Sequence, residues 1–195
     1  MNHAIENIDI IKDRRAMGMN PGKFIVWLFI VTIVMLFAAL TSAYVVKQTG
    51  GNWLHFDLPG MFWITSIIIV ISSFTIHIAL TAARKDNFSM LKIFLVLTTI
   101  LGFAFLAGQY QAWKQLVAMD VYFVGNPAGS FLYVLTGLHA LHIISGIIFL
   151  VTVIASSFQL KVHSKNIIKV EMCTTYWHFL GGLWLYLFLF LKINQ

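Results

Sequence analysis

Five uninterrupted apolar blocks constrain the fold of this chain more than any other feature. No Lys, Arg, Asp or Glu occurs inside them, and they cover residues 24–46, 61–83, 93–113, 130–160 and 172–191. Each block has the roughly 20 residues that a helix needs to cross a hydrocarbon core about 30 Å thick. Because a backbone in lipid must satisfy its own hydrogen bonds, each block is expected to be a helix. The sequence therefore predicts an all-α bundle of five transmembrane helices.

We expect one membrane domain, residues 23–195, after a polar segment of residues 1–22 that does not resemble a cleavable signal peptide. Within it, the helices are expected over about residues 24–46, 61–83, 93–113, 130–160 and 171–191. The fourth block is longer than one span requires. Its outer end, near Pro127 and Gly129, is therefore either a loop or part of a helix that tilts or projects from the bilayer.

The Lys and Arg residues are distributed unevenly among the segments that flank these helices. The segments before the first helix, between the second and third, and between the fourth and fifth hold ten, and the other three segments hold three. The positive-inside rule then places the amino terminus in the cytoplasm and the carboxyl terminus outside. The positions of the aromatic residues agree with this orientation, because Tyr and Trp are enriched at membrane interfaces. The aromatic residues at the expected outer boundary are Tyr44, Trp53, Trp63, Tyr110, Trp113 and Tyr122.

The composition excludes several classes of protein. Hydrophobic residues make up 59% of the chain and charged residues 10%, which is not the balance of a soluble domain. The net charge of +6 follows from the loop bias and suits anionic lipid headgroups. No basic helix or aromatic platform is present, so nucleic acid is not an expected partner. Cys173 is the one cysteine, which rules out an internal disulfide and a Cys-rich metal site.

Small, polar and ionisable residues fall on one stripe of three expected helices. At helical spacing, the stripes are Ser66, Ser73 and His77; Leu135, His139, His142 and Gly146; and Glu171, Thr175, His178 and Gly182. Such residues are typical of contacts between membrane helices. We expect these stripes to face one another or a partner subunit rather than lipid. The candidate site residues, as structural polar groups between helices, are His77, His139, His142, Glu171 and His178.

A prosthetic group is the alternative interpretation of the histidines. A haem held in a bundle needs imidazoles from two helices at matched depth, and His142 and His178 would qualify on depth alone. A cluster of two histidines with Glu171 could also suit a transition metal. However, the additional closely spaced histidines of a membrane diiron site are absent, and Glu171 is expected far from His139. We therefore expect no catalytic residue, cofactor or metal on this chain, with neutral histidines as hydrogen-bond partners between helices.

Two segments resemble signatures of one known family. Thr136-Gly-Leu-His-Ala-Leu-His-Ile-Ile-Ser-Gly146 is similar to the TGxHGxHVxxG stretch of subunit III of haem–copper terminal oxidases, and Glu171-x4-Tyr176-Trp-His-Phe-x4-Trp184 resembles its E-x4-YWHF-x4-W signature. Weaker matches precede them in the same order, at Phe29 to Tyr44 and at Gln109-Tyr-Gln-Ala-Trp113. The resemblance covers about residues 24–191. A double match with the correct order and separation is specific.

The resemblance implies a five-helix form of a subunit often built from seven helices. In that family subunit III is non-catalytic and holds neither haem nor copper; it packs beside subunit I, which holds both haems and the copper of the oxygen site. It supports assembly, stability and proton uptake, and binds phospholipid. The expected partners are therefore subunit I, subunit II and other oxidase subunits in a bacterial cytoplasmic membrane. A larger assembly with a quinol-oxidising complex is a further hypothesis.

Two departures from the family pattern limit what carries over. Many members have a Glu in the first shared helix, where this chain has Ile33, and an Asp after the WHF run, where this chain has Gly181. Without a carboxylate at mid-membrane, a proton path through this chain is not expected. Glu171 is retained. It either accepts hydrogen bonds from loops or an interfacial Lys, or it is a hydrated carboxylate at the membrane edge.

Other functions compete with the cytochrome c oxidase interpretation. A quinol oxidase uses the same type of subunit, and nothing in this sequence reports the electron donor. A small transporter would be expected to show internal repeats, broken helices and polar sites at the midplane. A free-standing membrane cytochrome would show a Soret band when this chain alone is purified. We favour a subunit of a proton-pumping oxygen reductase.

Overall fold

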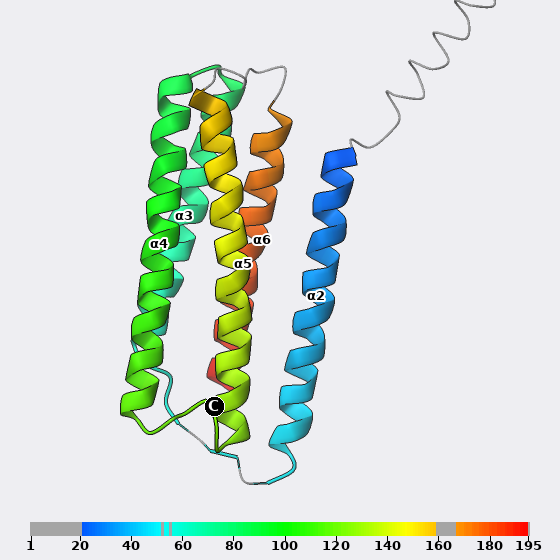
Figure 1. Cartoon of the computed structure of the whole chain (residues 1–195), viewed down its shortest axis with the longest axis vertical. Helices are drawn as coiled ribbons and strands as arrows, with labels where there is room; N and C mark the ends of the chain where they lie inside the picture. Colours follow the sequence, from blue (N-terminus) through cyan, green and yellow to red (C-terminus); the bar gives the residue numbers. More distant parts are fainter. Residues whose placement is uncertain (1–20, 52, 55, 159–166, 195) are drawn as a thin grey trace, which may run out of the picture.

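The computed structural model describes residues 21–51, 53–54, 56–158 and 167–194, and these form five long helices (Figure 1). The helices are α2 (Pro21–Gln48), α3 (Met61–Arg84), α4 (Phe88–Ala118), α5 (Pro127–Phe158) and α6 (Ile168–Ile193). All five are long and apolar enough to cross a membrane. The expected all-α bundle of five transmembrane helices is confirmed. Most of the amino-terminal segment, residues 1–20, lies outside the described residues.

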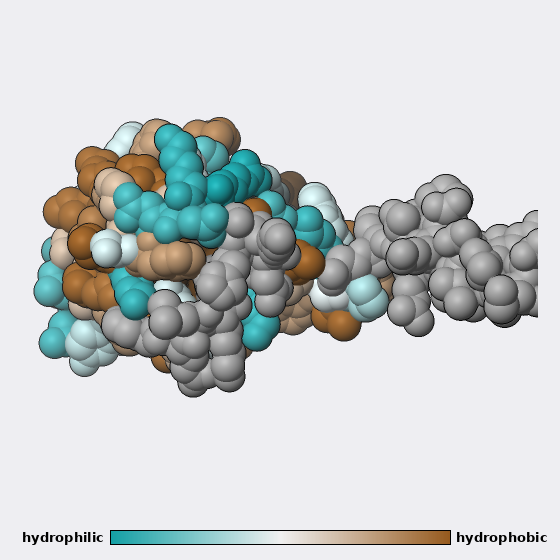
Figure 2. All heavy atoms as spheres, turned by 90° about the horizontal axis from the view of Figure 1, so that it is seen from above, coloured by the Kyte–Doolittle hydropathy of each residue, from teal (hydrophilic) through white to brown (hydrophobic). Residues whose placement is uncertain are grey.

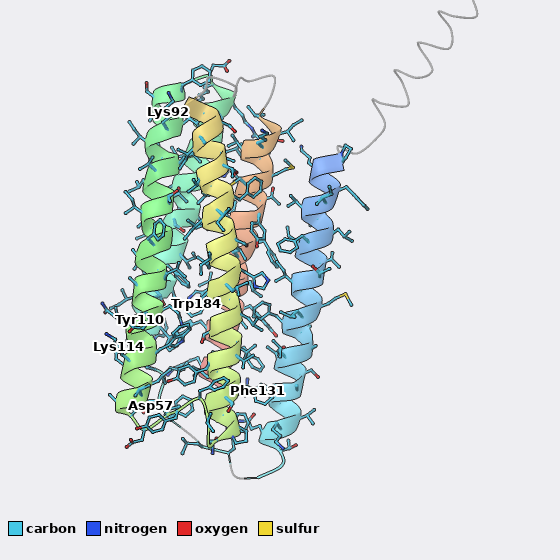
Figure 3. All side chains as sticks on the ribbon, viewed as in Figure 1. Asp57, Lys92, Tyr110, Lys114, Phe131 and Trp184 are labelled. Carbon is cyan, nitrogen blue, oxygen red and sulfur yellow. The ribbon has the colours of Figure 1, made fainter. Side chains whose placement is uncertain are left out.

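Helix α4 is five residues longer at each end than the expected span of 93–113. Its start is fixed by Asn87, whose side-chain oxygen accepts a hydrogen bond from the Met90 amide at 3.2 Å. Lys92 and Lys114 lie inside the helix near its two ends, and Lys114 extends over the Tyr110 ring at 4.7 Å from its centroid (Figure 3). The prediction ended the helix at these two charges. A lysine can nevertheless lie within the helix, because its long side chain lets the ammonium reach the membrane interface.

The outer end of the fourth block is helical, which decides between the two alternatives for Pro127. Proline suits the first position of a helix, because its missing amide would have no partner there. The preceding Asn126 accepts a hydrogen bond from the Ala128 amide at 2.9 Å through its side chain. The helix ends at Phe158, and the last two residues of the expected block, 159–160, lie outside the described residues.

Helices α3 to α6 pack around a common core, and α2 stands at the side of this group (Figure 1). Helix α2 contacts α5 and α6 along a single stripe, and its buried residues recur every three or four positions: Ile30, Ile33, Phe37, Thr41 and Tyr44. Most of the remainder of α2 is exposed, and most of its exposed side chains are apolar. Figure 2 looks onto the end where α2 begins, and shows hydrophilic residues gathered there with hydrophobic residues around them.

Aromatic side chains gather at the opposite end of the bundle. The Tyr44 ring lies 4.7 Å from that of Trp53, 5.8 Å from Phe131 and 5.2 Å from Phe190, measured between centroids. The Tyr44 hydroxyl donates to the Asn194 carbonyl at 3.1 Å. This cluster joins the end of α2 to α5 and α6.

Candidate functional site

An ionic cluster joins three helices at the end of the bundle where α2 begins. The Glu171 carboxylate on α6 lies 2.8 Å from the Lys23 ammonium on α2 and 3.2 Å from the Arg84 guanidinium on α3. One carboxylate therefore faces two cations. Of the two states left open for Glu171, the structure has the one paired with a lysine, and it adds an arginine that the sequence analysis did not consider.

His139 is fully buried in the core among aromatic rings. Its ring lies 5.8 Å from that of Phe105 on α4 and 5.2 Å from that of Trp184 on α6, between centroids. Trp184 points into the bundle between the helices (Figure 3). Among the described residues, neither ring nitrogen of His139 has a hydrogen-bond partner. His139 therefore joins helices by ring packing instead of the expected hydrogen bond.

His142 turns toward α2 and away from the core. Its Nδ1 atom lies 2.7 Å from the Leu138 carbonyl of its own helix. Its ring lies 6.4 Å from Phe29 and 5.8 Å from Phe37 on α2, between centroids. These two phenylalanines lie one turn before and one turn after Ile33, which is buried. His142 thus packs on the two turns that flank the position where many family members carry an acid.

His178 faces His77 across the contact between α6 and α3. Their ring centroids are 6.1 Å apart, and both line a groove whose floor includes Ser73 and Gly181. His77 is exposed and His178 is half-buried. His178 therefore does not meet His142, although the two lie at similar expected depth, because they sit on different sides of the bundle.

Gly182 is not a site of close helix approach within this chain, so contact with another stripe of the same chain, one of the two predicted alternatives, does not apply to it. A Cβ atom built on Gly182 would meet nothing within 4 Å, whereas one on Gly181 would lie 3.1 Å from Ser73 Oγ. Neighbouring residues differ by about 100° around a helix. This rotation turns Gly182 to the exposed side when Gly181 faces α3.

Apart from Ser66, the residues that form hydrogen bonds between core helices lie outside the predicted stripes. The Trp177 indole donates to Ser72 Oγ and the Trp184 indole to Ser66 Oγ, each at 3.0 Å, which ties α6 to α3. The seven-residue spacing of the two tryptophans on one helix face was the available signal. Further links between helices are Thr75 with Thr98, Trp113 with Thr136, Ser145 with Tyr176, and Tyr186 with Thr41.

Trp177 fits the core because two glycines face it. A Cβ atom on Gly102 of α4 would lie 2.8 Å from the indole, and one on Gly146 of α5 would lie 3.2 Å from it. The indole therefore lies in a space left by two neighbouring helices, with its nitrogen bonded to a third. Small residues that admit a large neighbour are typical of packed membrane helices.

Residues 11–194 match the family model described as cytochrome c oxidase subunit III. The chain belongs to this family. A cytochrome c oxidase subunit 3 of Synechocystis is 32% identical over 85% of this chain and 72% of its own. A cytochrome c oxidase subunit 3 of Corynebacterium diphtheriae is 27% identical over both whole chains. A probable quinol oxidase subunit 3 of Staphylococcus saprophyticus is 26% identical over 96% of this chain and 94% of its own.

Family membership assigns the chain to a respiratory haem–copper oxidase, as its subunit III. Its partners are the other subunits of that oxidase, and its five apolar helices place it in a membrane. This chain is therefore one subunit of an enzyme complex, the terminal oxidase.

Proposed function

We propose that this chain is a non-catalytic subunit that stabilises the oxidase core and carries no redox centre of its own. The observation that supports this is the divergence of its histidines. His139 lies in the core, His142 faces α2, and His178 faces His77 on a third side. A haem held by two imidazoles needs both to point at one iron atom. The arrangement does not fit a haem between His142 and His178.

A metal site fits the described residues no better. No group of three His, Cys, Asp or Glu side chains among them is close enough to hold a metal ion. Glu171 is already paired with two cations, and Cys173 is buried. We propose that both haems and the copper lie in partner subunits. The role of this chain is then to support subunit I and, through it, the proton-pumping machinery.

We propose that cytochrome c is the electron donor and that its electrons enter the complex through subunit II. Two of the relatives above are named cytochrome c oxidase subunits, and one of them matches over its whole length. Quinol is the second candidate, because the Staphylococcus saprophyticus relative is named a probable quinol oxidase subunit. Oxygen uptake by the tagged complex, supplied with reduced cytochrome c or with quinol, separates the two. Uptake with quinol alone would contradict the first proposal.

We propose a bacterial cytoplasmic membrane as the location, with the amino terminus in the cytoplasm. The end of the bundle with Lys23, Arg84 and Glu171 would then face the cytoplasm, and the Tyr44 cluster would lie outside. Lys23 and Arg84 line a hollow with Trp27 and Thr175, in which the two cations could bind a phospholipid headgroup beside Glu171. Assembly with a quinol-oxidising complex stays a hypothesis, favoured by the exposed apolar surface of α2.

Purification of the native complex through a tag on this chain tests the proposed function. We expect a haem-bearing subunit to co-purify in equal amount and the complex to reduce oxygen. Recovery of the chain without any haem-bearing partner, under conditions gentle enough to keep other membrane complexes intact, would contradict it.

A further inference from the structure

The groove between α3 and α6 exposes two imidazoles on the outside of the bundle. His77 and His178 line it together with Phe74 on its rim and with Ser73 and Gly181. His77 is seven residues from Arg84, and His178 is seven residues from Glu171. At 1.5 Å per residue this puts both rings about 10 Å below the ionic cluster, within the apolar part of their helices.

The outward faces of α4 and α5 at this depth are apolar. Helix α4 exposes Ile93 and Val96, and helix α5 exposes Ile144 and Ile148. Lipid chains can cover such faces. They cannot cover imidazoles equally well, because ionisable groups within the membrane are costly and almost always face protein or water.

We propose that this groove receives a transmembrane helix of another oxidase subunit, which presents a hydroxyl or amide side chain to His77 and His178. A neutral imidazole offers one donor and one acceptor, so a group that both donates and accepts can satisfy the pair. Among the described residues, no hydrogen bond joins either ring to another side chain of this chain. The inference rests on the proposed function, since it names the face through which the subunit meets its complex.

The groove also has room for a neighbouring backbone. Gly182 borders it, and a Cβ atom there would meet nothing within 4 Å. Small residues allow membrane helices to approach closely, and polar side chains then hydrogen-bond across the contact. Gly182 therefore lies where the helix of another subunit would approach most closely.

Photocrosslinking in the intact complex tests this face directly. Benzoylphenylalanine would replace Phe74, which is 68% exposed on the rim of the groove, or Phe103, which is 57% exposed on α4. The two sites are a matched pair, since each exchanges one exposed phenylalanine for the same larger group. We expect an adduct between this chain and another oxidase subunit from position 74, and only lipid adducts or none from position 103.

Three results would overturn the proposal: a subunit adduct from position 103 and none from 74, lipid adducts alone from 74, or an adduct of two copies of this chain from 74. In each case a haem-bearing subunit can still co-purify with this chain. Failure of the proposed docking face is therefore distinguishable from failure of the proposed function.

Substitution of the imidazoles supplies a second readout that does not depend on the crosslinker. His77→Leu with His178→Leu should lower retention of this chain during detergent washing of a complex tagged on a haem-bearing subunit. The expected loss is about fivefold or more, as for removal of a hydrogen-bonded contact between membrane helices. His77→Gln with His178→Gln keeps donors and acceptors and should restore most retention. Equal retention of the leucine and wild-type chains would contradict the proposal.

Discussion

The buried tryptophans and the buried histidine have different energetic roles, although they come from the same two motifs. The Trp184 indole donates a hydrogen bond to Ser66 on another helix, whereas His139 beside it contributes a flat ring and two nitrogens without partners. A hydrogen bond typically contributes about 1 kcal/mol, and a buried polar atom without a partner destabilises the fold by a similar amount. Replacement of the two residues should therefore act in opposite directions.

His139→Phe and Trp184→Phe test this difference. We expect His139→Phe to be close to neutral or mildly stabilising, because it keeps the ring contacts with Phe105 and Trp184 and removes the unpaired nitrogens. Trp184→Phe should destabilise by about 1–3 kcal/mol, because Ser66 loses its donor and the core loses volume. Denaturant titration of the chain in detergent measures both. A large destabilisation by His139→Phe would mean that His139 has a polar partner after all.

Ile33 explains how the structure accommodates a departure from the family pattern. It lies on the buried stripe of α2, between the two phenylalanines that contact His142. An apolar side chain there suits the rings around it. The sequence identified the substitution, but only the structure shows that His142 packs on the turns that flank it.

At the scale of the helices, the position of each glycine decides what it does. Gly146 on α5 faces the Trp177 indole and Leu180, whose atoms would lie 3.0–3.2 Å from a Cβ there, whereas the space beside Gly182 is open. The sequence put both glycines on contact stripes. A periodic pattern gives the faces of a helix only to within about one residue. On α6 a shift of one residue, from Gly181 to Gly182, separates the side that faces α3 from the exposed side.

Valine at each glycine separates the two environments. Gly146→Val should lower the free energy of unfolding of the chain by about 1–3 kcal/mol, because the branched side chain overlaps the indole. Gly182→Val should leave it nearly unchanged or raise it slightly, since glycine is the poorer helix former. Thermal unfolding in detergent is the measurement. Equal losses for the two variants would mean that α6 is rotated relative to the structure described above.

Helix α2 is attached to the bundle at its two ends by different means. The Tyr44 cluster holds one end by aromatic packing, and the Lys23–Glu171 pair holds the other by charge. Partly exposed ion pairs contribute about 0–1 kcal/mol each and weaken in salt. The end with Glu171 is therefore the weaker attachment.

Glu171→Gln should loosen α2 at its first turns only. Neutralisation removes the ion pairs with Lys23 and Arg84, so amide hydrogen exchange should accelerate severalfold near residue 23, consistent with a loss of about 0.5–1 kcal/mol. Exchange near Tyr44 should not change. Lys169→Gln, an exposed change two residues before Glu171 on the same helix, is the control. Equal acceleration in the control, or none in Glu171→Gln, would contradict this role of the cluster.

At the scale of the whole molecule, the fold could be predicted because lipid leaves few alternatives. Charge-free blocks of sufficient length must be helices, and the charge-flanked ends misplaced only α4 appreciably. The site was less predictable. The four histidines were identified, but their directions depend on how helices rotate against one another. The Trp–Ser pairs that link α3 and α6 were missed because indoles in a membrane sequence look like ordinary hydrophobic residues.

We propose that this chain is a support without a redox centre, so the location of haem after dissociation tests the account most directly. The oxidase would be isolated through a tag on this chain, and the chain then released with a harsher detergent and separated from the core. We predict that all haem absorbance and all copper stay with the core and that the released chain is colourless. Haem that leaves with this chain, in stoichiometric amount, would contradict the account.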